Sequence, residues 1–367
     1  MINYVGAQEE RVLLILGLLA CSDKDETGPD DTGDTSSPDD TGDIEYQGPE
    51  GCEEAHATFT SASGGTEDLT QVMTDGTYYT FTEDGTLEVC PGTWFTHLVA
   101  HANVTVKGLD ATPDTTILSG GELGTIIEVS GPYTLRVENV TLNRGAGLDV
   151  EHNSGGGGIY CEGEGRVEVE GAVFSQNFAN DGAGLYAQYC AVDVQNSLFH
   201  DNLVDDDGGA LTLWFSTGLL YNVIFDNNTG LDGGAMAVFQ SDLEVYNTTY
   251  SNNTSDNFAG ALWVHESSAT IVDSVFDANT NLDTQGGAML LNGSISLNRV
   301  EVTGNSAPRG GGVFVYWESD VLGTSVLFRD NSPEDIFVAD YSTAGGESIW
   351  GNEDYSFFCE ENACEEL

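Results

Sequence analysis

Apolar and polar residues alternate in short runs along most of this chain. Examples are Leu-Thr-Leu-Trp from residue 211, Met-Ala-Val-Phe from residue 236 and Val-Glu-Val from residue 167. An alternation with a period of two is typical of a strand that buries one of its faces. Glycine, asparagine and aspartate clusters separate the runs, and no stretch shows the 3.6-residue period of an amphipathic helix. The pattern therefore predicts an all-β protein made of many short strands.

Two phrases recur at one period between residues 156 and 331. The first is Gly-Gly-Ala followed by an apolar residue, or a close variant, and it starts at Gly156, Gly182, Gly208, Gly233, Ala259, Gly286 and Gly310, in steps of 26, 26, 25, 26, 27 and 24 residues. The second is Phe-x-x-Asn, with first residues Phe174, Phe199, Phe225, Tyr250, Phe276, Val302 and Phe328. Its last residues are Asn177, Asn202, Asn228, Asn253, Asn279, Asn305 and Asn331. Two phrases that keep one period of this length indicate a solenoid.

The strands within each unit select the type of solenoid. A unit of about 25 residues with two or three short strands is typical of one turn of a right-handed, single-stranded parallel β-helix. Helical repeats are excluded by the strand pattern, and the Leu-x-x-Leu-x-Leu pattern of leucine-rich repeats is missing. Residues 60–155 carry less regular alternating runs, which we expect to bring the total to ten or eleven coils. Equivalent residues of neighbouring coils should then stack about 4.8 Å apart.

The repeated residue types have structural reasons in that geometry. Glycine allows a positive φ and a close backbone approach at the corner that opens each coil. The asparagine side chains can hydrogen-bond from coil to coil and satisfy buried turn backbone. Any function therefore has to lie in the positions that vary between coils.

Together, the Gly-Gly-Ala and Phe-x-x-Asn phrases resemble the repeats of the polymorphic outer membrane proteins of chlamydiae, over residues 156–331. In that family the repeats form a surface-displayed passenger implicated in adhesion, carried by a C-terminal membrane barrel. Only 36 residues follow Asn331 here, too few for such a barrel. The resemblance thus implies surface display and adhesion, with a different means of anchoring.

The N-terminal segment offers such an anchor. The apolar run of residues 12–20 ends at Leu18-Leu19-Ala20-Cys21, which resembles the lipobox of bacterial lipoproteins and implies diacylation of Cys21. Nine apolar residues are too few to cross a bilayer, so a signal peptide is the better interpretation, although Glu9 and Glu10 are unusual in one. A cytosolic apolar N-terminus is the alternative.

The chain is accordingly expected to have five parts. They are a signal peptide over residues 1–21, a disordered acidic linker over 22–50, an N-terminal cap with irregular coils over 51–155, regular repeats over 156–352 and a cysteine-containing tail over 353–367. We expect a monomer on the outer face of the outer membrane, in contact with the membrane through its lipid alone.

Six cysteines remain after Cys21, and an even number in an exported chain suggests disulfides. Cys161 and Cys190 are one coil plus three residues apart, which can place them on adjacent coils. Fifteen pairings are possible, and the ones we favour are Cys52–Cys90, Cys161–Cys190 and Cys359–Cys364. A zinc site is the rival interpretation, but no Cys-x-x-Cys pair supports it.

Acidic residues outnumber basic ones by 61 to 9, which gives a formal net charge of −52. Such a chain repels nucleic acid and anionic lipid headgroups, and it repels uronic-acid polysaccharides unless calcium bridges them. Asp205, Asp206 and Asp207 precede Gly208, and comparable turns hold Asp181 and Asp232. Oxygen-rich turns suit calcium, yet aspartate is also an ordinary turn residue. No cofactor is required by the sequence, and calcium is a candidate ligand.

An exposed stripe of side chains is the candidate binding site. These side chains belong to the outward-facing positions of the strand after each Gly-Gly-Ala. We expect the exposed residues to include Tyr160, Tyr186, Trp214, Phe239, Trp263, His265, Phe314 and Tyr316. Exposed aromatic rings on a stiff rod can hold a glycan or a protein partner. The alternative is that the rings stack from coil to coil, or lie beneath a loop, and only stabilise the sheet.

Many β-helix proteins act on polysaccharides, so catalysis is the second hypothesis. A lyase needs a base and cationic or metal neutralisation of the sugar carboxylate, and only seven basic residues follow residue 51. A hydrolase needs paired carboxylates. This chain has so many acidic residues that a pair of them does not distinguish a hydrolase from a non-catalytic protein. We therefore expect non-catalytic binding or adhesion, with a carbohydrate-active lyase or hydrolase as the alternative and a structural envelope spacer as the third.

Overall fold

The computed structural model describes residues 52, 54, 56–147, 155–339, 342–351 and 357–359. The chain divides into two units, Met1–Tyr46 and Gln47–Leu367, and every described residue belongs to the second. The predicted signal peptide with Cys21, the whole predicted linker and Cys364 lie outside the described residues. Within the part of the chain that is described, no helix is long and apolar enough to cross a membrane.

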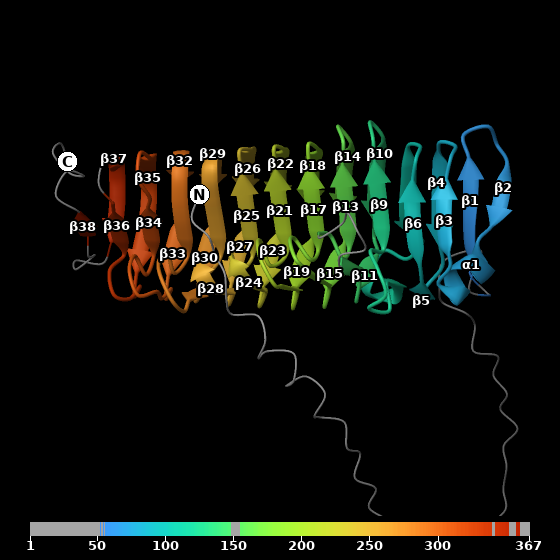
Figure 1. Ribbon diagram of the computed structural model, residues 1–367, viewed down its shortest axis with the longest axis horizontal. Coiled ribbons are helices and arrows are strands. Elements are labelled where there is room, and N and C mark those ends of the chain that lie inside the picture. The colour runs from blue at the N-terminus through green and yellow to red at the C-terminus, as the bar shows by residue number, and fades with distance from the viewer. Residues whose placement is uncertain are drawn as a thin grey trace, which may run out of the picture. The chain divides into compact units, whose positions relative to one another are not determined.

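The second unit begins with a cap. Strands β1 (Ala57–Ser61) and β2 (Thr66–Asp68) form an antiparallel hairpin, and β1 also pairs antiparallel with β4 (Gly85–Val89). Helix α1 (Thr70–Asp75) follows and buries Met73 against the core (Figure 1). An atypical end unit of this kind closes the apolar interior, which a regular coil would leave open.

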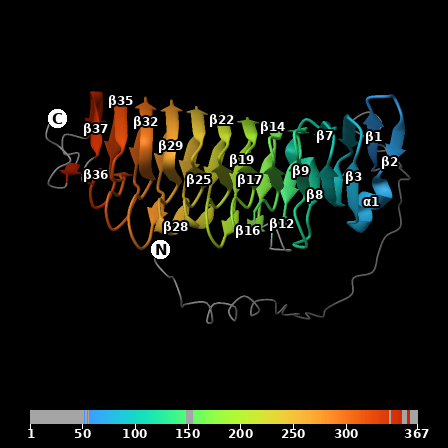
Figure 2. The ribbon, with the colours of Figure 1, turned by 45° about the horizontal axis from the view of Figure 1, so that its top comes forward.

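Beyond the cap, parallel strands stack into three columns, and within a column the strands of successive coils lie side by side along the long axis (Figure 1, Figure 2). The first column contains β3 (Tyr78–Phe81), β6 (His97–Ala100), β9 (Ile127–Ser130), β13 (Ile159–Glu162), β17 (Leu185–Gln188), β21 (Leu211–Trp214), β25 (Met236–Phe239), β29 (Leu262–Val272), β32 (Met289–Asn298), β34 (Val313–Val315), β36 (Ile336–Val338) and β38 (Phe357–Cys359). The second contains β4, β7 (Val104–Gly108), β10 (Thr134–Glu138), β14 (Arg166–Glu170), β18 (Ala191–Gln195), β22 (Thr217–Tyr221), β26 (Asp242–Tyr246), the later parts of β29 and β32, β35 (Asp320–Arg329) and β37 (Thr343–Gly351).

The third column completes each coil. It contains β5 (Gly92–Phe95), β8 (Thr116–Ser119), β11 (Thr141–Asn143), β15 (Val173–Ser175), β19 (Leu198–His200), β23 (Ile224–Asp226), β27 (Thr249–Ser251), β30 (Val275–Asp277), β33 (Glu301–Thr303) and the end of β35. The end of β37 extends this column, since Phe328 of β35 pairs with Gly351. The solenoid has about nine turns, fewer than the ten or eleven coils expected from the sequence. The predicted all-β parallel solenoid is confirmed.

A small fourth sheet lies where each coil returns toward its Gly-Gly-Ala phrase. It contains β12 (Ala146–Gly147), β16 (Phe178–Ala179), β20 (Leu203–Val204), β24 (Thr229–Asp232), β28 (Thr254–Phe258) and β31 (Thr280–Asn281). Beyond this point the chain turns at a glycine with positive φ, such as Gly208 at 65°. The second glycine of the phrase has no room for a side chain. In the following coil, for example, a Cβ on Gly234 would lie 2.3 Å from the carbonyl oxygen of Gly260. The Gly-Gly-Ala residues therefore form a tight corner where neighbouring coils stack closely.

The interior is apolar and holds a stack of aromatic rings from the Phe-x-x-Asn phrases. Phe174, Phe199, Phe225, Tyr250 and Phe276 are fully buried, and consecutive ring centroids are 4.3, 4.9, 4.9 and 4.5 Å apart. These distances equal the strand spacing, since one ring comes from each coil.

The asparagines of the same phrase form a continuous hydrogen-bonded ladder. The Asn253 side-chain nitrogen donates to the Asn279 side-chain oxygen at 2.9 Å and to the Phe225 carbonyl at 3.0 Å. Its side-chain oxygen accepts from the backbone and side-chain nitrogens of Asn228, at 2.9 and 3.0 Å. The ladder runs through Asn177, Asn202, Asn228, Asn253, Asn279, Asn305 and Asn331. The predicted hydrogen bonding from coil to coil is confirmed.

We expect the variant Asn253→Ala to lower the free energy of unfolding by about 3 kcal/mol, because it leaves buried backbone and amide groups of two neighbouring coils without partners. The measurement is the midpoint of chemical denaturation followed by circular dichroism. Asn298→Ala is the matched control, since Asn298 is partly exposed and its side-chain oxygen accepts from Arg299 at the surface. The control should change stability by less than about 0.5 kcal/mol. Equal losses in the two variants would contradict the ladder's importance.

Candidate functional site

The predicted exposed stripe is largely buried. Tyr160, Tyr186, Phe239 and Phe314 are only 6, 8, 5 and 2 % exposed, so the expectation that they face solvent is wrong. The chain before each Gly-Gly-Ala folds over the outer face of the strand that follows. In one coil the hydroxyl of Thr212, on β21, donates to the carbonyl of Asp207 at 2.8 Å.

The buried rings of the stripe stack between coils. Tyr160 and Tyr186 have ring centroids 5.5 Å apart, and Phe314 stacks on Phe337 at 4.8 Å. Their arrangement fits the alternative that such rings stabilise the sheet. Trp214, Trp263 and His265 are partly exposed and Tyr316 is 37 % exposed. Of these, Trp263, His265 and Tyr316 line one small cavity of about 120 Å³.

A larger open groove, of about 680 Å³, lies at the turns that join the first column to the second. Five successive coils line it, through residues 164–165, 189–191, 215–217, 240–242 and 266–268. Hydroxyl groups tie the turns together, because the backbone nitrogens of Cys190, Ser216 and Ser241 each donate to a serine of the next coil, at 3.0, 2.9 and 3.0 Å. The groove is therefore a rigid surface that runs from coil to coil.

Each of these turns begins with a residue in the left-handed region. The residues are Glu164, Tyr189, Phe215, Gln240 and Glu266, with φ of 66°, 57°, 50°, 46° and 48°. A left-handed conformation costs a non-glycine residue roughly 1–2 kcal/mol, and an aromatic side chain is uncommon there. Tyr189 and Phe215 are nevertheless 51 % and 41 % exposed, so burial does not offset this cost.

The two rings form a platform in the groove. Their centroids are 5.2 Å apart with an angle of 10° between the ring planes, and the ring of Trp214 lies 6.2 Å from that of Phe215. The left-handed turn recurs in the other coils, so what distinguishes these two is the exposed aromatic surface that Tyr189 and Phe215 present there. Tyr189 and Phe215 are not among the site residues predicted from the sequence, because each lies one residue beyond the alternating run of its strand. Their signal was an aromatic residue at a turn position that other coils fill with Glu or Gln.

The charge of the groove restricts its ligands. Glu164, Asp242 and Glu266 lie among its lining residues, and neither Lys nor Arg does. The Gln240 amide donates to Glu266 at 3.0 Å, which leaves carboxylate and amide oxygens available at the rim. The groove therefore suits uncharged, hydroxyl-rich ligands and disfavours anions.

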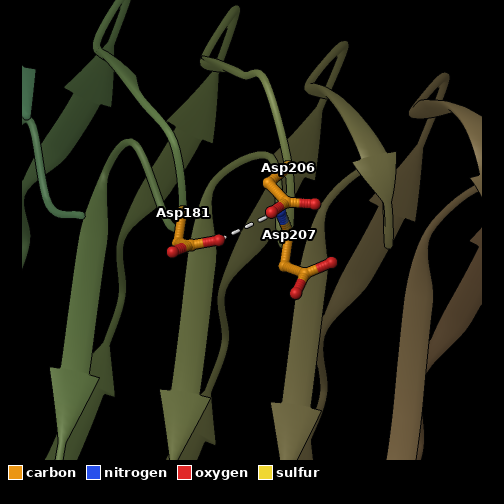
Figure 3. A group of neighbouring side chains, drawn as sticks. All are labelled: Asp181, Asp206 and Asp207. Carbon is orange, nitrogen blue, oxygen red and sulfur yellow. Dashed lines mark hydrogen bonds between the residues drawn. The ribbon is translucent and has the colours of Figure 1, made fainter. Parts of the chain in front are cut away.

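A group of carboxylates lies at a different place, in the turns before two Gly-Gly-Ala phrases. Asp181, Asp206 and Asp207 each bring an oxygen within 4.8 Å of the others, whereas Asp205 is exposed and outside the group (Figure 3). The Asp181 carboxylate accepts from the backbone nitrogen of Asp207 at 3.2 Å, as Figure 3 shows. One carboxylate oxygen of Asp207, Oδ1, is buried and has no hydrogen-bond partner in the described structure.

The environment of this cluster disfavours negative charge. Burial, with neighbouring carboxylates, raises the pKa of Asp207 to about 9, and burial raises the pKa of Asp181 and of Asp232 to about 6. Because these folded-state values lie above the ordinary aspartate value, the cluster favours the fold at low pH, and this contribution is lost as the pH rises through them. A cation would compensate the repulsion.

Two of the three favoured disulfides are present. Cys52 bonds to Cys90 and Cys161 bonds to Cys190, with Cα atoms 5.6 and 6.4 Å apart. The second bond links β13 of one coil to the turn after β17 of the next, and Cys190 lies in the lining of the groove. The third pairing remains a prediction, because Cys364 and the side chain of Cys359 lie outside the described residues.

The arginines that a lyase would need are engaged with acids. Arg136 and Arg166 both contact Glu168, at 3.7 and 2.6 Å, and Arg144 contacts Glu122 at 2.6 Å. These ion pairs are exposed and are worth little to stability. They do, however, give each guanidinium a carboxylate partner within the protein.

Comparisons with known proteins address the fold. A family model described as a right handed beta helix region matches residues 125–332. Among solved structures, the A-module of the mannuronan C-5 epimerase AlgE4 of Azotobacter vinelandii is similar at 11 % identity, over 78 % of this chain and 89 % of that chain, with a TM-score of 0.31. A likeness this weak carries no argument about function. No curated protein matches this chain.

Proposed function

Because this chain belongs to the family of right-handed β-helix proteins, with the hand that the sequence predicted, we propose that it is a non-catalytic binding protein for an uncharged glycan. The glycan lies in the groove formed by the five turns between residues 164 and 268. The observation that carries the proposal is the exposed, stacked pair of Tyr189 and Phe215.

Physical chemistry supports a sugar ligand. Aromatic ring faces pack against the apolar face of a sugar ring, while polar groups around them bond its hydroxyls. The groove crosses five coils at about 4.8 Å each, so it suits a chain of sugars better than a single small molecule. The carboxylates of Glu164, Asp242 and Glu266 can accept hydrogen bonds from hydroxyls but repel uronic acids.

We expect Tyr189→Asn and Phe215→Asn each to weaken glycan binding about tenfold, which corresponds to about 1.4 kcal/mol. Asparagine tolerates the left-handed conformation, so neither variant should lower the melting temperature. The measurement is a glycan-array screen followed by calorimetry on the hits, with chromatography of the bound glycan to detect cleavage.

Tyr221→Asn is the matched control, because Tyr221 is 49 % exposed and lies outside the groove lining. The control should bind as the unmodified protein does. Binding that survives loss of both rings contradicts the proposal. Cleavage products would favour the enzyme hypothesis. Absence of binding to every glycan on the array would favour a structural envelope spacer.

We also propose that the protein is a surface lipoprotein of the outer membrane, anchored by Cys21. The support is the apolar run of residues 12–20 that ends at this cysteine, and the acidic, polar segment of residues 22–50 that follows it. The folded solenoid would then stand away from the membrane on a tether, with its groove accessible.

The variant Cys21→Ser should lose metabolic labelling with a palmitate analogue and move from the membrane fraction to the soluble fraction. Antibody binding to intact cells checks the outward orientation. The control is a conservative change at Ser22, the next residue, to Thr. Lipid labelling that persists in Cys21→Ser would contradict the hypothesis that Cys21 carries the anchor.

We propose in addition that calcium is a ligand of the Asp181, Asp206 and Asp207 cluster. The specific support is the buried Asp207 oxygen without a hydrogen-bond partner, beside two further carboxylates.

Calcium should raise the melting temperature relative to a chelator, because a ligand of the native state stabilises it by mass action. Asp207→Asn should abolish this increase, and it should change the melting temperature little in chelator near neutral pH, because Asp207, with a pKa of about 9, is already uncharged there. Asp205→Asn, in the same turn but outside the cluster, is the control. The same calcium effect in both variants would rule out the site.

A further inference from the structure

A small aromatic pocket lies outside the groove, on the outer face of the first column. Its cavity of about 120 Å³ is lined by Phe258, Trp263, His265, Leu290 and Tyr316. Phe258 ends β28, Trp263 and His265 lie on β29, Leu290 lies on β32, and Tyr316 follows β34. Three neighbouring coils therefore form the pocket.

The pocket arises from a difference in side-chain size between coils. Trp263, Leu290 and Phe314 occupy one outward column, in register on consecutive coils. The middle coil contributes an aliphatic side chain, whereas both flanking coils contribute rings, including Tyr316 two residues after Phe314. Rings two coils apart are separated by about 10 Å, which leaves room for a compact group between them. Phe258 closes one side, with its ring centroid 5.5 Å from that of Trp263.

The same surface already holds one cation. Leu290, Phe314 and Phe337 are buried in a hydrophobic cluster outside the main core, with Phe258 and Trp263 packed against it. The Arg309 guanidinium lies 5.7 Å from the Phe314 centroid and 5.6 Å from the Phe337 centroid. Ring faces attract cations because their quadrupole is negative over the face.

The pocket has the composition of an aromatic cage. Four of its five lining residues are rings, and neither a carboxylate nor an arginine or lysine is among them. A small hydrated metal ion would lose its water without gaining oxygen ligands there. A methylated ammonium is weakly hydrated and apolar at its surface, and the net charge of −52 attracts it to this protein.

We propose that this pocket binds a quaternary ammonium group, such as the trimethylammonium of choline. The methyl groups contact Phe258, Trp263 and Tyr316, and the charge is held by ring faces rather than by a salt bridge. The site is independent of the glycan groove, because Tyr189 and Phe215 lie outside it.

The test uses the full chain and two probes of the same shape. Choline should bind at least tenfold more tightly than 3,3-dimethylbutan-1-ol, its uncharged isostere, as measured by calorimetry and by ligand-observed NMR. Equal binding of the two probes, or no binding of choline, overturns the proposal. Sedimentation with phosphatidylcholine vesicles distinguishes a lipid headgroup from a free solute as the source of the ammonium.

Variants locate the site. Tyr316→Ser should weaken choline binding about tenfold, whereas Trp317→Ser, at an exposed neighbour outside the lining, should not. Leu290→Phe keeps the outer cluster apolar, extends the ring column and fills the cavity, so it should abolish binding in a folded protein. Tyr189→Asn should leave choline binding unchanged. Choline binding that survives both Tyr316→Ser and Leu290→Phe overturns this assignment.

Discussion

The coil-to-coil register is the constraint on which the rest of this structure depends. A single coil of about 26 residues has too few inward apolar side chains to fold by itself. Each coil is therefore held by the parallel strands of its neighbours and by the asparagine ladder from Asn177 to Asn331. The ladder fixes the register, because each amide donates both to the asparagine of the next coil and to a carbonyl of the preceding coil. A slip of one residue would break these bonds and turn the interior rings outward.

Fixed register also determines how binding surfaces form. When equivalent turns stack, one position in each coil becomes a continuous line along the solenoid, and its chemistry depends on what each coil places there. In the groove this line holds Glu164, Tyr189, Phe215, Gln240 and Glu266. At the aromatic pocket a smaller residue, Leu290, interrupts a column of rings and leaves a cavity. Both candidate sites are thus local departures from a repeat that otherwise serves folding.

The acidic surface gives these sites a common electrostatic setting. A net charge of −52 disfavours anions everywhere on the protein and favours cations. It disfavours anionic ligands in the groove, and it would attract an ammonium group toward the rings of the aromatic pocket. Where carboxylates are forced together in turns, at Asp181, Asp206 and Asp207, the repulsion is partly relieved by protonation.

The sequence alone determined the features that depend on the period. Strand alternation and the two repeated phrases predicted the solenoid, the glycine corners and the asparagine ladder. The spacing of Cys161 and Cys190 favoured their pairing, because an offset of one coil plus three residues can place two cysteines on adjacent coils.

The tertiary structure decided which outward residues meet solvent. Alternation distinguishes the inside of a coil from the outside, but it does not reveal that the outward side chains of Tyr160, Tyr186, Phe239 and Phe314 are covered. It also gives no account of the turn after the strand, where Tyr189 and Phe215 form the platform. Exposure and cavities depend on side chains from neighbouring coils and loops, and those contacts exist only once the coils have stacked.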